Sequence, residues 1–163
     1  VGGGAIGKKT MALARAFGCD VYFYNRHETQ IEGAAYVSLD ELMRISDIIS
    51  LHVPLTADTK GLIGREEIGK MKKTAILINT ARGAVVDSQA LADALRENRI
   101  AGAGIDVFES EPPIANDHPL LHAPNVILAP HVGFATQEAM EKRAVIAFKN
   151  VAAYLSGKPQ NVM

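Results

Sequence analysis

Short apolar runs alternate with segments of helical periodicity along the chain, and this alternation constrains the fold more than any other feature. Strands are predicted at residues 21–24, 35–37, 47–53, 75–78, 101–107 and 126–128. Helices are predicted at residues 5–17, 38–45, 65–71, 87–97 and 135–155, with Ser38 and Asp87 as N-caps. Alternating strands and helices are typical of a parallel sheet with right-handed crossovers. The sequence therefore predicts an α/β fold with a doubly wound parallel sheet.

The composition limits the class of protein. With 163 residues and 48% hydrophobic content, the chain has the size of one domain and can bury a sizeable core. Its 17 basic and 18 acidic residues leave a net charge of -1, with no basic run to follow a nucleic-acid backbone. No apolar stretch approaches the roughly 20 residues of a membrane span, and no charged and then apolar leader precedes the glycines. The single cysteine, Cys19, fits a reducing compartment, so we expect a soluble cytoplasmic protein.

A glycine-rich turn opens the chain. Residues 2–7 have the G-x-G-x-x-G spacing, in which glycines let a pyrophosphate approach the N-terminus of the following helix. The motif predicts a Rossmann-type dinucleotide site with cofactor contacts from Gly2, Gly4, Ala5, Ile6 and Gly7. Only Val1 precedes the turn, whereas such a turn is fed by a strand at the centre of the sheet. We therefore expect a largely missing first strand, a gap beside residues 21–24, and a fragment of a longer polypeptide.

The residues that select between NAD and NADP stand at the end of the second strand. An acidic side chain there accepts hydrogen bonds from the adenosine ribose, but this chain has Asn25 followed by Arg26 and His27. Asn25 can still bind a hydroxyl, while Arg26, with His27, can bind a 2′-phosphate by charge-assisted hydrogen bonds. The alternative is that Arg26 is a solvated loop charge and Glu28 takes the acidic role. The sequence slightly favours NADP over NAD.

Polar residues follow the apolar runs. The carboxyl ends of parallel strands share one edge of a sheet, and ligands bind in the crevice outside it. That edge is expected to gather Asn25, His52, Asn79, Asp106 and His131. By contrast, His118 and His122 are expected on the surface.

Arg82, Glu111 and His131 combine a cation, a carboxylate and a titratable imidazole. Arg82 follows a buried run, where a guanidinium is costly without an anionic partner, and its planar fork suits a carboxylate. His131 lies in a stiff turn between Pro130 and Gly133, and a histidine titrates at about pH 6.5, which suits proton exchange. Glu111 against the ring would favour the imidazolium and fix its tautomer. The alternatives are a surface ion pair for Arg82 and a plain acidic loop for Glu111. The combination predicts hydride transfer to a carbonyl.

Three stretches make the chain similar to the cofactor domain of the D-isomer-specific 2-hydroxyacid dehydrogenases over nearly its whole length. They are residues 2–7, residues 46–54 running on to Thr59 and Gly64, and residues 71–87. The resemblance implies that Arg82 grips and polarises a 2-oxo acid, that His131 is the acid/base and that Glu111 is its partner. It also implies that Asp106 holds the nicotinamide carboxamide. The remaining implied cofactor contacts are Val53, Pro54, Thr59, Thr80, Ala81, His131 and Gly133.

The resemblance further implies the reversible reduction of a 2-oxo acid to a D-2-hydroxy acid with NADH or NADPH, and no metal. Glyoxylate or hydroxypyruvate reductases and phosphoglycerate dehydrogenases are the expected branches. Formate dehydrogenases of the same superfamily pair their histidine with glutamine, so Glu111 argues against that branch. The acid stays open among glyoxylate, hydroxypyruvate, lactate-type and phosphoglycerate-type substrates.

The expected organisation is a dinucleotide-binding domain at residues 1–163. Its tail, from about residue 150, returns toward a substrate domain outside the chain. A homodimer is expected, without nucleic-acid or membrane partners. One alternative is a nucleotide-sensing protein like the transcriptional corepressors that the family resembles. Another is an oxidoreductase that acts on an amino or phosphonate substrate.

Overall fold

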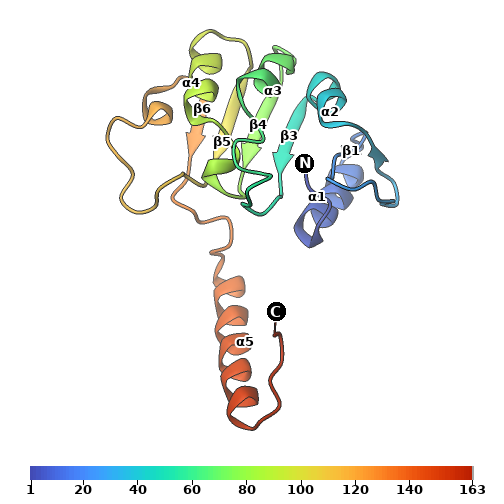
Figure 1. Cartoon of the computed structure of the whole chain (residues 1–163), viewed down its shortest axis with the longest axis vertical. Helices are drawn as coiled ribbons and strands as arrows, with labels where there is room; N and C mark the ends of the chain where they lie inside the picture. The colour runs from blue at the N-terminus through green and yellow to red at the C-terminus, as the bar shows by residue number, and fades with distance from the viewer. Residues whose placement is uncertain (163) are drawn as a thin grey trace. The chain divides into compact units, whose positions relative to one another are not determined.

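The computed structural model describes residues 1–162, so Met163, the last residue of the expected domain, lies outside the described residues. The chain divides into two compact units, Val1–Pro130 and His131–Met163 (Figure 1). The first unit contains the sheets and four of the α-helices, and the second contains the last helix. Each unit is described by itself below.

Parallel strands form the centre of the first unit. Four strands pair in the order β3-β4-β5-β6, and two more form a separate small sheet, β1-β2. Every pairing is parallel. The strands are β1 (Tyr22–Phe23), β2 (Ala35–Tyr36), β3 (Ile48–Leu51), β4 (Ile76–Asn79), β5 (Gly102–Ile105) and β6 (Val126–Leu128). The predicted parallel sheet is therefore confirmed.

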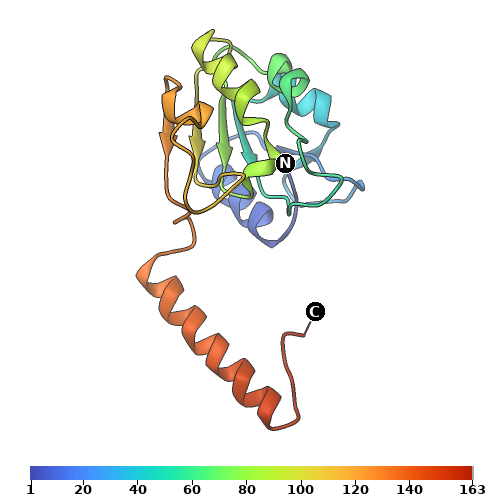
Figure 2. The ribbon, with the colours of Figure 1, turned by 60° about the vertical axis from the view of Figure 1, so that its left-hand side comes forward.

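Helices connect these strands. They are α1 (Ala5–Ala16), α2 (Leu39–Ile45), α3 (Arg65–Lys70), α4 (Ser88–Arg96) and the 3-10 helices η1 (Gly83–Val85) and η2 (Pro119–His122). Both predicted N-caps are confirmed: Ser38 Oγ accepts from the amide of Glu41 at 3.1 Å, and a carboxylate oxygen of Asp87 accepts from the amide of Ala90 at 2.9 Å. The two 3-10 helices were not predicted. Figures 1 and 2 show α3 and α4 against the large sheet in both views.

The core lies between the large sheet and the helices packed on it. Leu91 and Leu95 of α4 are fully buried, as are Leu51 of β3 and Leu77 of β4. Burial alternates along the strands, so that Ile48, next to buried Ile49, is 63% exposed. One face of the sheet therefore carries the core.

Val1 and Gly2 occupy the place of the first strand, between the two sheets. On one side the amino group of Val1 donates to the Ser50 carbonyl, and the amide of His52 donates to the Val1 carbonyl, both at 2.8 Å. On the other side the amide of Gly2 donates to the Tyr24 carbonyl at 2.9 Å. Next to these residues is a cavity of about 540 Å³ between α1, β1, α2 and β3. The predictions of a largely missing first strand and of a gap beside residues 21–24 are confirmed.

The second unit consists mainly of α5 (Gln137–Leu155), drawn in orange and red in Figure 2. Its N-cap is Thr136, whose hydroxyl accepts from the amide of Ala139 at 3.2 Å. None of the helical residues is buried, and Phe148 and Tyr154 are 77% and 74% exposed. Within the described part of the chain, none of the helices combines the length and the hydropathy that crossing a membrane requires.

Candidate active site

The glycine turn leads directly into α1. Gly2 has a φ of +97°, a left-handed conformation that favours glycine. A Cβ on Gly2 would lie 2.7 Å from the His52 carbonyl oxygen, and a Cβ on Gly7 would overlap the Gly2 carbonyl oxygen. These two glycines let the turn and the helix pack closely. By contrast, a Cβ on Gly4 would meet nothing within 4 Å, so the space beside Gly4 is open.

The N-terminus of α1 follows Gly4 and has no capping side chain. Gly4 is the N-cap, and the first turn contains no acidic residue. The partial positive charge of a helix N-terminus attracts anions, and free amide groups there bind phosphate oxygens. The turn therefore fits the pyrophosphate of a dinucleotide. This turn carries the first group of predicted cofactor contacts, Gly2, Gly4, Ala5, Ile6 and Gly7.

A pocket of about 550 Å³ lies between the loop after β1 and the loop after β3. Pockets of this size bind small molecules. We call it the β1–β3 pocket; its lining includes five predicted cofactor contacts, Asn25, Arg26, Val53, Pro54 and Thr59. It also includes residues that the sequence did not single out, among them Tyr24, Thr29, Thr56, Asp58 and Leu62.

Asn25 ties the glycine turn to the loop after β1. Its Oδ1 accepts from the amide of Gly3 at 2.7 Å, and its Nδ2 donates to Thr29 Oγ1 at 3.2 Å. A carboxamide oxygen accepts two hydrogen bonds and its nitrogen donates two. Each atom of the Asn25 amide therefore has the capacity for one further bond, to a ribose hydroxyl for example. The bond to Gly3 was not foreseen from the sequence.

Arg26 forms an ion pair across the pocket with Asp58. Its Nη1 lies 2.6 Å from Asp58 Oδ2. Both side chains are exposed, at 70% and 63%. Arg26 is thus a surface charge, but it has a carboxylate partner from the loop after β3.

That loop is held in shape by Thr59. The Thr59 hydroxyl donates to the Pro54 carbonyl at 2.6 Å, and the amide of Thr56 donates to Thr59 Oγ1 at 2.8 Å. Further along, the amide of Gly61 donates to the Ala84 carbonyl at 2.8 Å. The loop after β3 is therefore joined to the segment that follows β4.

Asn79 shapes the turn that carries Arg82. Asn79 is 1% exposed; its Nδ2 donates to the Arg82 carbonyl and its Oδ1 accepts from the amide of Ala81, both at 3.0 Å. Asn79 was expected at the carboxyl edge of the sheet, and the structure shows that its side chain holds the turn after β4 there. The Arg82 side chain is exposed, and its Nη1 donates to the Ala81 carbonyl at 2.6 Å. No ion pair of Arg82 occurs within residues 1–162.

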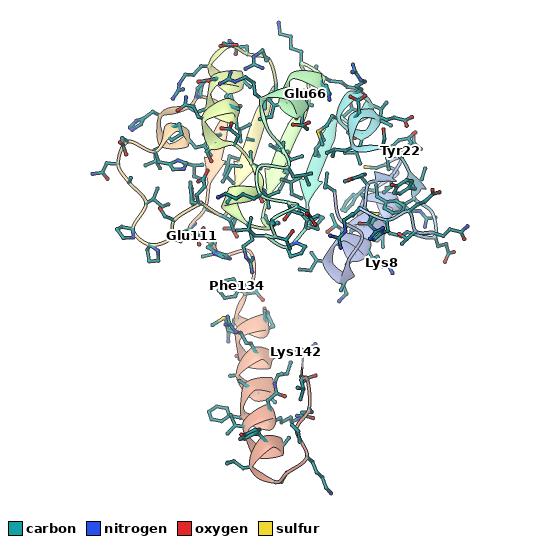
Figure 3. All side chains as sticks on the ribbon, viewed as in Figure 1. Lys8, Tyr22, Glu66, Glu111, Phe134 and Lys142 are labelled. Atoms are coloured by element: carbon teal, nitrogen blue, oxygen red, sulfur yellow. The ribbon has the colours of Figure 1, made fainter. Side chains whose placement is uncertain are left out.

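The Arg82 turn packs on the loop after β5. A Cβ on Gly83 would overlap the carbonyl group of Phe108, so only glycine fits there. In the same loop the amide of Phe108 donates to a carboxylate oxygen of Glu111. Arg82 and Glu111 are therefore carried by adjacent segments, and Figure 3 shows Glu111 at the edge of the sheet toward which the strands run. Asp106, directly after β5, is 6% exposed at this edge.

Glu109 anchors the same loop to α4. Its Oε2 lies 3.0 Å from His118 Nε2, and it is also hydrogen-bonded to Ser88. Partial burial raises the pKa of Glu109, but the bonds from Ser88 and His118 outweigh it and hold the pKa below its ordinary value. The His118 ring packs edge-on against Phe108 at 5.3 Å, so the expectation of a surface role for His118 is wrong.

His131 begins the second unit. It has a φ of +55°, which is uncommon outside glycine and is found in turns and at functional sites. Its ring lies edge-on to Phe134 at 5.8 Å between centroids, and the Arg143 guanidinium lies 5.3 Å from the centroid of the same Phe134 ring. The side chain is half-buried. Gly133 lies two residues further along this turn.

His52 has a different environment. Its Nε2 lies 3.0 Å from Ser50 Oγ, beside the glycine turn. Burial lowers the pKa of His52, so that the neutral form dominates near neutral pH. His52 thus packs against the glycine turn, with its backbone close to Gly2 and its Cβ close to Gly7.

The comparisons with known proteins name the family. Residues 1–133 match the family model of the D-isomer specific 2-hydroxyacid dehydrogenase, NAD binding domain. A glyoxylate reductase from Aeropyrum pernix is 48% identical over all of this chain and 50% of its own length. The chain spans about half the length of the curated relatives it matches.

Solved structures show the same fold. An acyclic imino acid reductase in complex with NADPH and D-Arg has a TM-score of 0.90 and 39% identity, over 99% of this chain and 52% of that one. An NAD complex of a D-isomer specific 2-hydroxyacid dehydrogenase from Lactobacillus delbrueckii ssp. bulgaricus has a TM-score of 0.88 and 31% identity, over 98% and 53%. The open glycine turn and the parallel sheet of this structure agree with the family match. The chain belongs to the D-isomer specific 2-hydroxyacid dehydrogenase family and contains its NAD-binding domain.

Proposed function

We propose that the protein reduces a 2-oxo acid to a D-2-hydroxy acid, reversibly, with NADH or NADPH. The observation that carries this proposal is the packing of the Arg82 turn on the loop of Glu111 through Gly83, in a chain that also has an open glycine turn. A cation and a carboxylate on adjacent segments are what a site needs to hold an oxo acid and to orient an acid/base.

In this reaction a bound nicotinamide dinucleotide supplies hydride to C2 of the oxo acid. The Arg82 guanidinium binds the substrate carboxylate and stabilises the negative charge that develops on the carbonyl oxygen. His131 donates a ring proton to that oxygen, and Glu111 favours its protonated form and fixes the ring tautomer. In the oxidation of the hydroxy acid, His131 accepts the proton from the hydroxyl.

The cofactor would lie along the carboxyl edge of the sheet. The glycine turn would bind the pyrophosphate, and Asn25, Arg26, Val53, Pro54 and Thr59 would surround the adenosine. Asp106 would bind the nicotinamide carboxamide, and Thr80, Ala81 and Gly133 are the remaining proposed cofactor contacts. Arg26 favours NADP slightly. One similar structure contains NADPH and another contains NAD, so the fold accommodates both.

Glyoxylate and hydroxypyruvate are the proposed substrates, since similar proteins are a glyoxylate reductase and a hydroxypyruvate reductase. We further propose a cytoplasmic homodimer, in which residues 1–163 form the dinucleotide-binding domain and the tail from about residue 150 returns toward a substrate domain. Imino acid reduction is a second candidate, because an imino acid reductase shares 39% of its residues and the fold.

The test is oxidation of NADH and NADPH by the full-length protein with glyoxylate, hydroxypyruvate, pyruvate and an amine-plus-oxo-acid mixture. The proposal expects turnover with at least one oxo acid alone and the D-isomer as product of hydroxypyruvate and pyruvate. Turnover only when an amine is present would select the imino acid reductase. Nucleotide binding without any turnover would instead favour a nucleotide-sensing protein.

A further inference from the structure

Two full charges face each other across the β1–β3 pocket. Among the described residues that line it, Arg26 comes from the loop after β1 and Asp58 from the loop after β3, and they are 32 positions apart. Their ion pair has an N–O distance of 2.6 Å. The cation that would bind a 2′-phosphate thus already has a carboxylate partner.

This ion pair is weak enough to exchange. Its side chains are 70% and 63% exposed, and water and salt screen the charges of exposed pairs. A phosphate carries more charge than a carboxylate and has three strong acceptor oxygens. The Arg26 guanidinium can therefore leave Asp58 for a phosphate, although the Asp58 carboxylate stays nearby and repels it.

We propose that Asp58 is a specificity-determining residue that opposes 2′-phosphorylated cofactors. It neutralises Arg26 when the pocket holds no phosphate, and it places a negative charge beside the phosphate when one binds. The inference rests on the proposed dinucleotide site and adds to it the residue that limits the preference for NADP. A dinucleotide without the 2′-phosphate meets no such repulsion.

Calorimetric titration of the full-length protein with adenosine 5′-monophosphate and with adenosine 2′,5′-bisphosphate tests this directly, without catalysis. The measured quantity is the ratio of the two dissociation constants. Removing the charge in Asp58→Asn should shift the ratio about two- to fivefold toward the bisphosphate, as expected for one screened charge. Removing the cation in Arg26→Gln should shift it in the opposite direction.

The double variant Asp58→Asn/Arg26→Gln isolates the ion pair. The shift of the ratio toward the bisphosphate from Arg26→Gln to the double variant should be smaller than the shift from the wild type to Asp58→Asn. The reason is that part of the effect of Asp58 acts through Arg26. An equal shift would overturn the role of the pair. Asp47→Asn is the matched control: Asp47 is 76% exposed and pairs with Lys72 at 2.8 Å, but it lies outside the pocket, so the ratio should stay constant.

The inference and the proposed function fail in different ways. A wild-type protein that binds neither nucleotide would overturn the dinucleotide site and this inference with it. A wild-type protein that binds both, with the same ratio in Asp58→Asn, would overturn the inference alone. Weaker binding of the monophosphate in Asp58→Asn, without a gain for the bisphosphate, would also overturn it and would make Asp58 a ribose ligand.

Discussion

Gly83 lies directly against the main chain of Phe108, and this contact joins the turn of Arg82 to the loop of Glu111. This contact is possible only because Gly83 has no side chain. It therefore links the stability of the fold to the geometry of the proposed site.

Gly83→Ala should destabilise the protein by about 1 to 3 kcal/mol, because the added Cβ must push the Phe108 main chain away. Urea unfolding of the full-length protein measures this loss. Gly69→Ala is the control, since a Cβ on Gly69 of α3 meets nothing within 4 Å, and alanine in a helix should stabilise by about 0.5 to 1 kcal/mol. Equal effects of the two substitutions would contradict the tight contact.

Alanine substitutions at Gly4 and Gly7 should have different effects, one on cofactor binding and the other on stability. Gly4→Ala leaves the fold close to wild-type stability but fills the open space beside the turn, so NADPH affinity should fall at least tenfold, or about 1.4 kcal/mol. Gly7→Ala should lower the unfolding temperature, because its Cβ overlaps the Gly2 carbonyl. Thermal unfolding and calorimetric titration with NADPH give the two readouts. Unchanged NADPH affinity in Gly4→Ala would place the pyrophosphate elsewhere.

His131→Gln should lower kcat by about 10²- to 10⁴-fold, the contribution of a general acid, while NADPH affinity changes little. Steady-state kinetics with the best oxo acid measures it. The control is His122→Gln, whose exposed ring contacts only the Asn116 carbonyl among the hydrogen bonds described for it. Equal rates for the two variants would remove His131 from the chemistry.

Arg82→Gln should raise the KM of the oxo acid and lower kcat by about 10²- to 10³-fold, because the developing charge loses its donor. Arg82→Lys should recover little, since a point charge does not replace the planar fork. Arg99→Gln, which breaks an outer ion pair with Glu97, serves as the control in the same assay. A change in KM alone would limit Arg82 to substrate binding.

Glu109 should make stability depend on pH in the acid range. Its folded-state pKa lies below the ordinary value of 4.5, so its contribution is complete above that value and is lost as the pH falls through the folded pKa. The difference in unfolding free energy between the wild type and Glu109→Gln should therefore shrink from pH 7 toward acid pH. If the difference in unfolding free energy grew as the pH falls, the pKa of Glu109 would be raised in the folded state and not lowered.

The sequence predicted the elements well because local signals specify them. The N-caps Ser38 and Asp87, the glycine turn and the apolar runs all act within a few residues of where they stand. Four strands, β1, β2, β3 and β5, are shorter than predicted, because the predicted runs continue past the last paired position, whereas β6 matches its prediction and β4 is shifted by one residue. The η1 helix was missed, since its short turn is fixed by the distant contact between Gly83 and Phe108.

Partners across the fold were harder to predict. Nothing near Arg26 indicates that Asp58, from another loop, faces it, and nothing near His118 indicates that its ring is held by Phe108 and Glu109. A single sequence carries the residue types of such pairs but not the loop paths that bring them together. The strand-end rule placed Asn79 at the correct edge, but it could not tell a ligand contact from a side chain that holds its own turn.

The main-chain hydrogen bond from the Gly61 amide to the Ala84 carbonyl fixes the distance between two ends of the carboxyl edge of the sheet, the loop after β3 and the segment after β4. One end lines the proposed adenosine pocket, and the other carries Arg82, the proposed ligand of the oxo acid. Since amide and carbonyl groups hold this span, exchanges of side chains at either end leave the spacing intact. In the proposed site, cofactor preference and substrate preference are therefore expected to change through separate substitutions, without a change in the distance between the two ends.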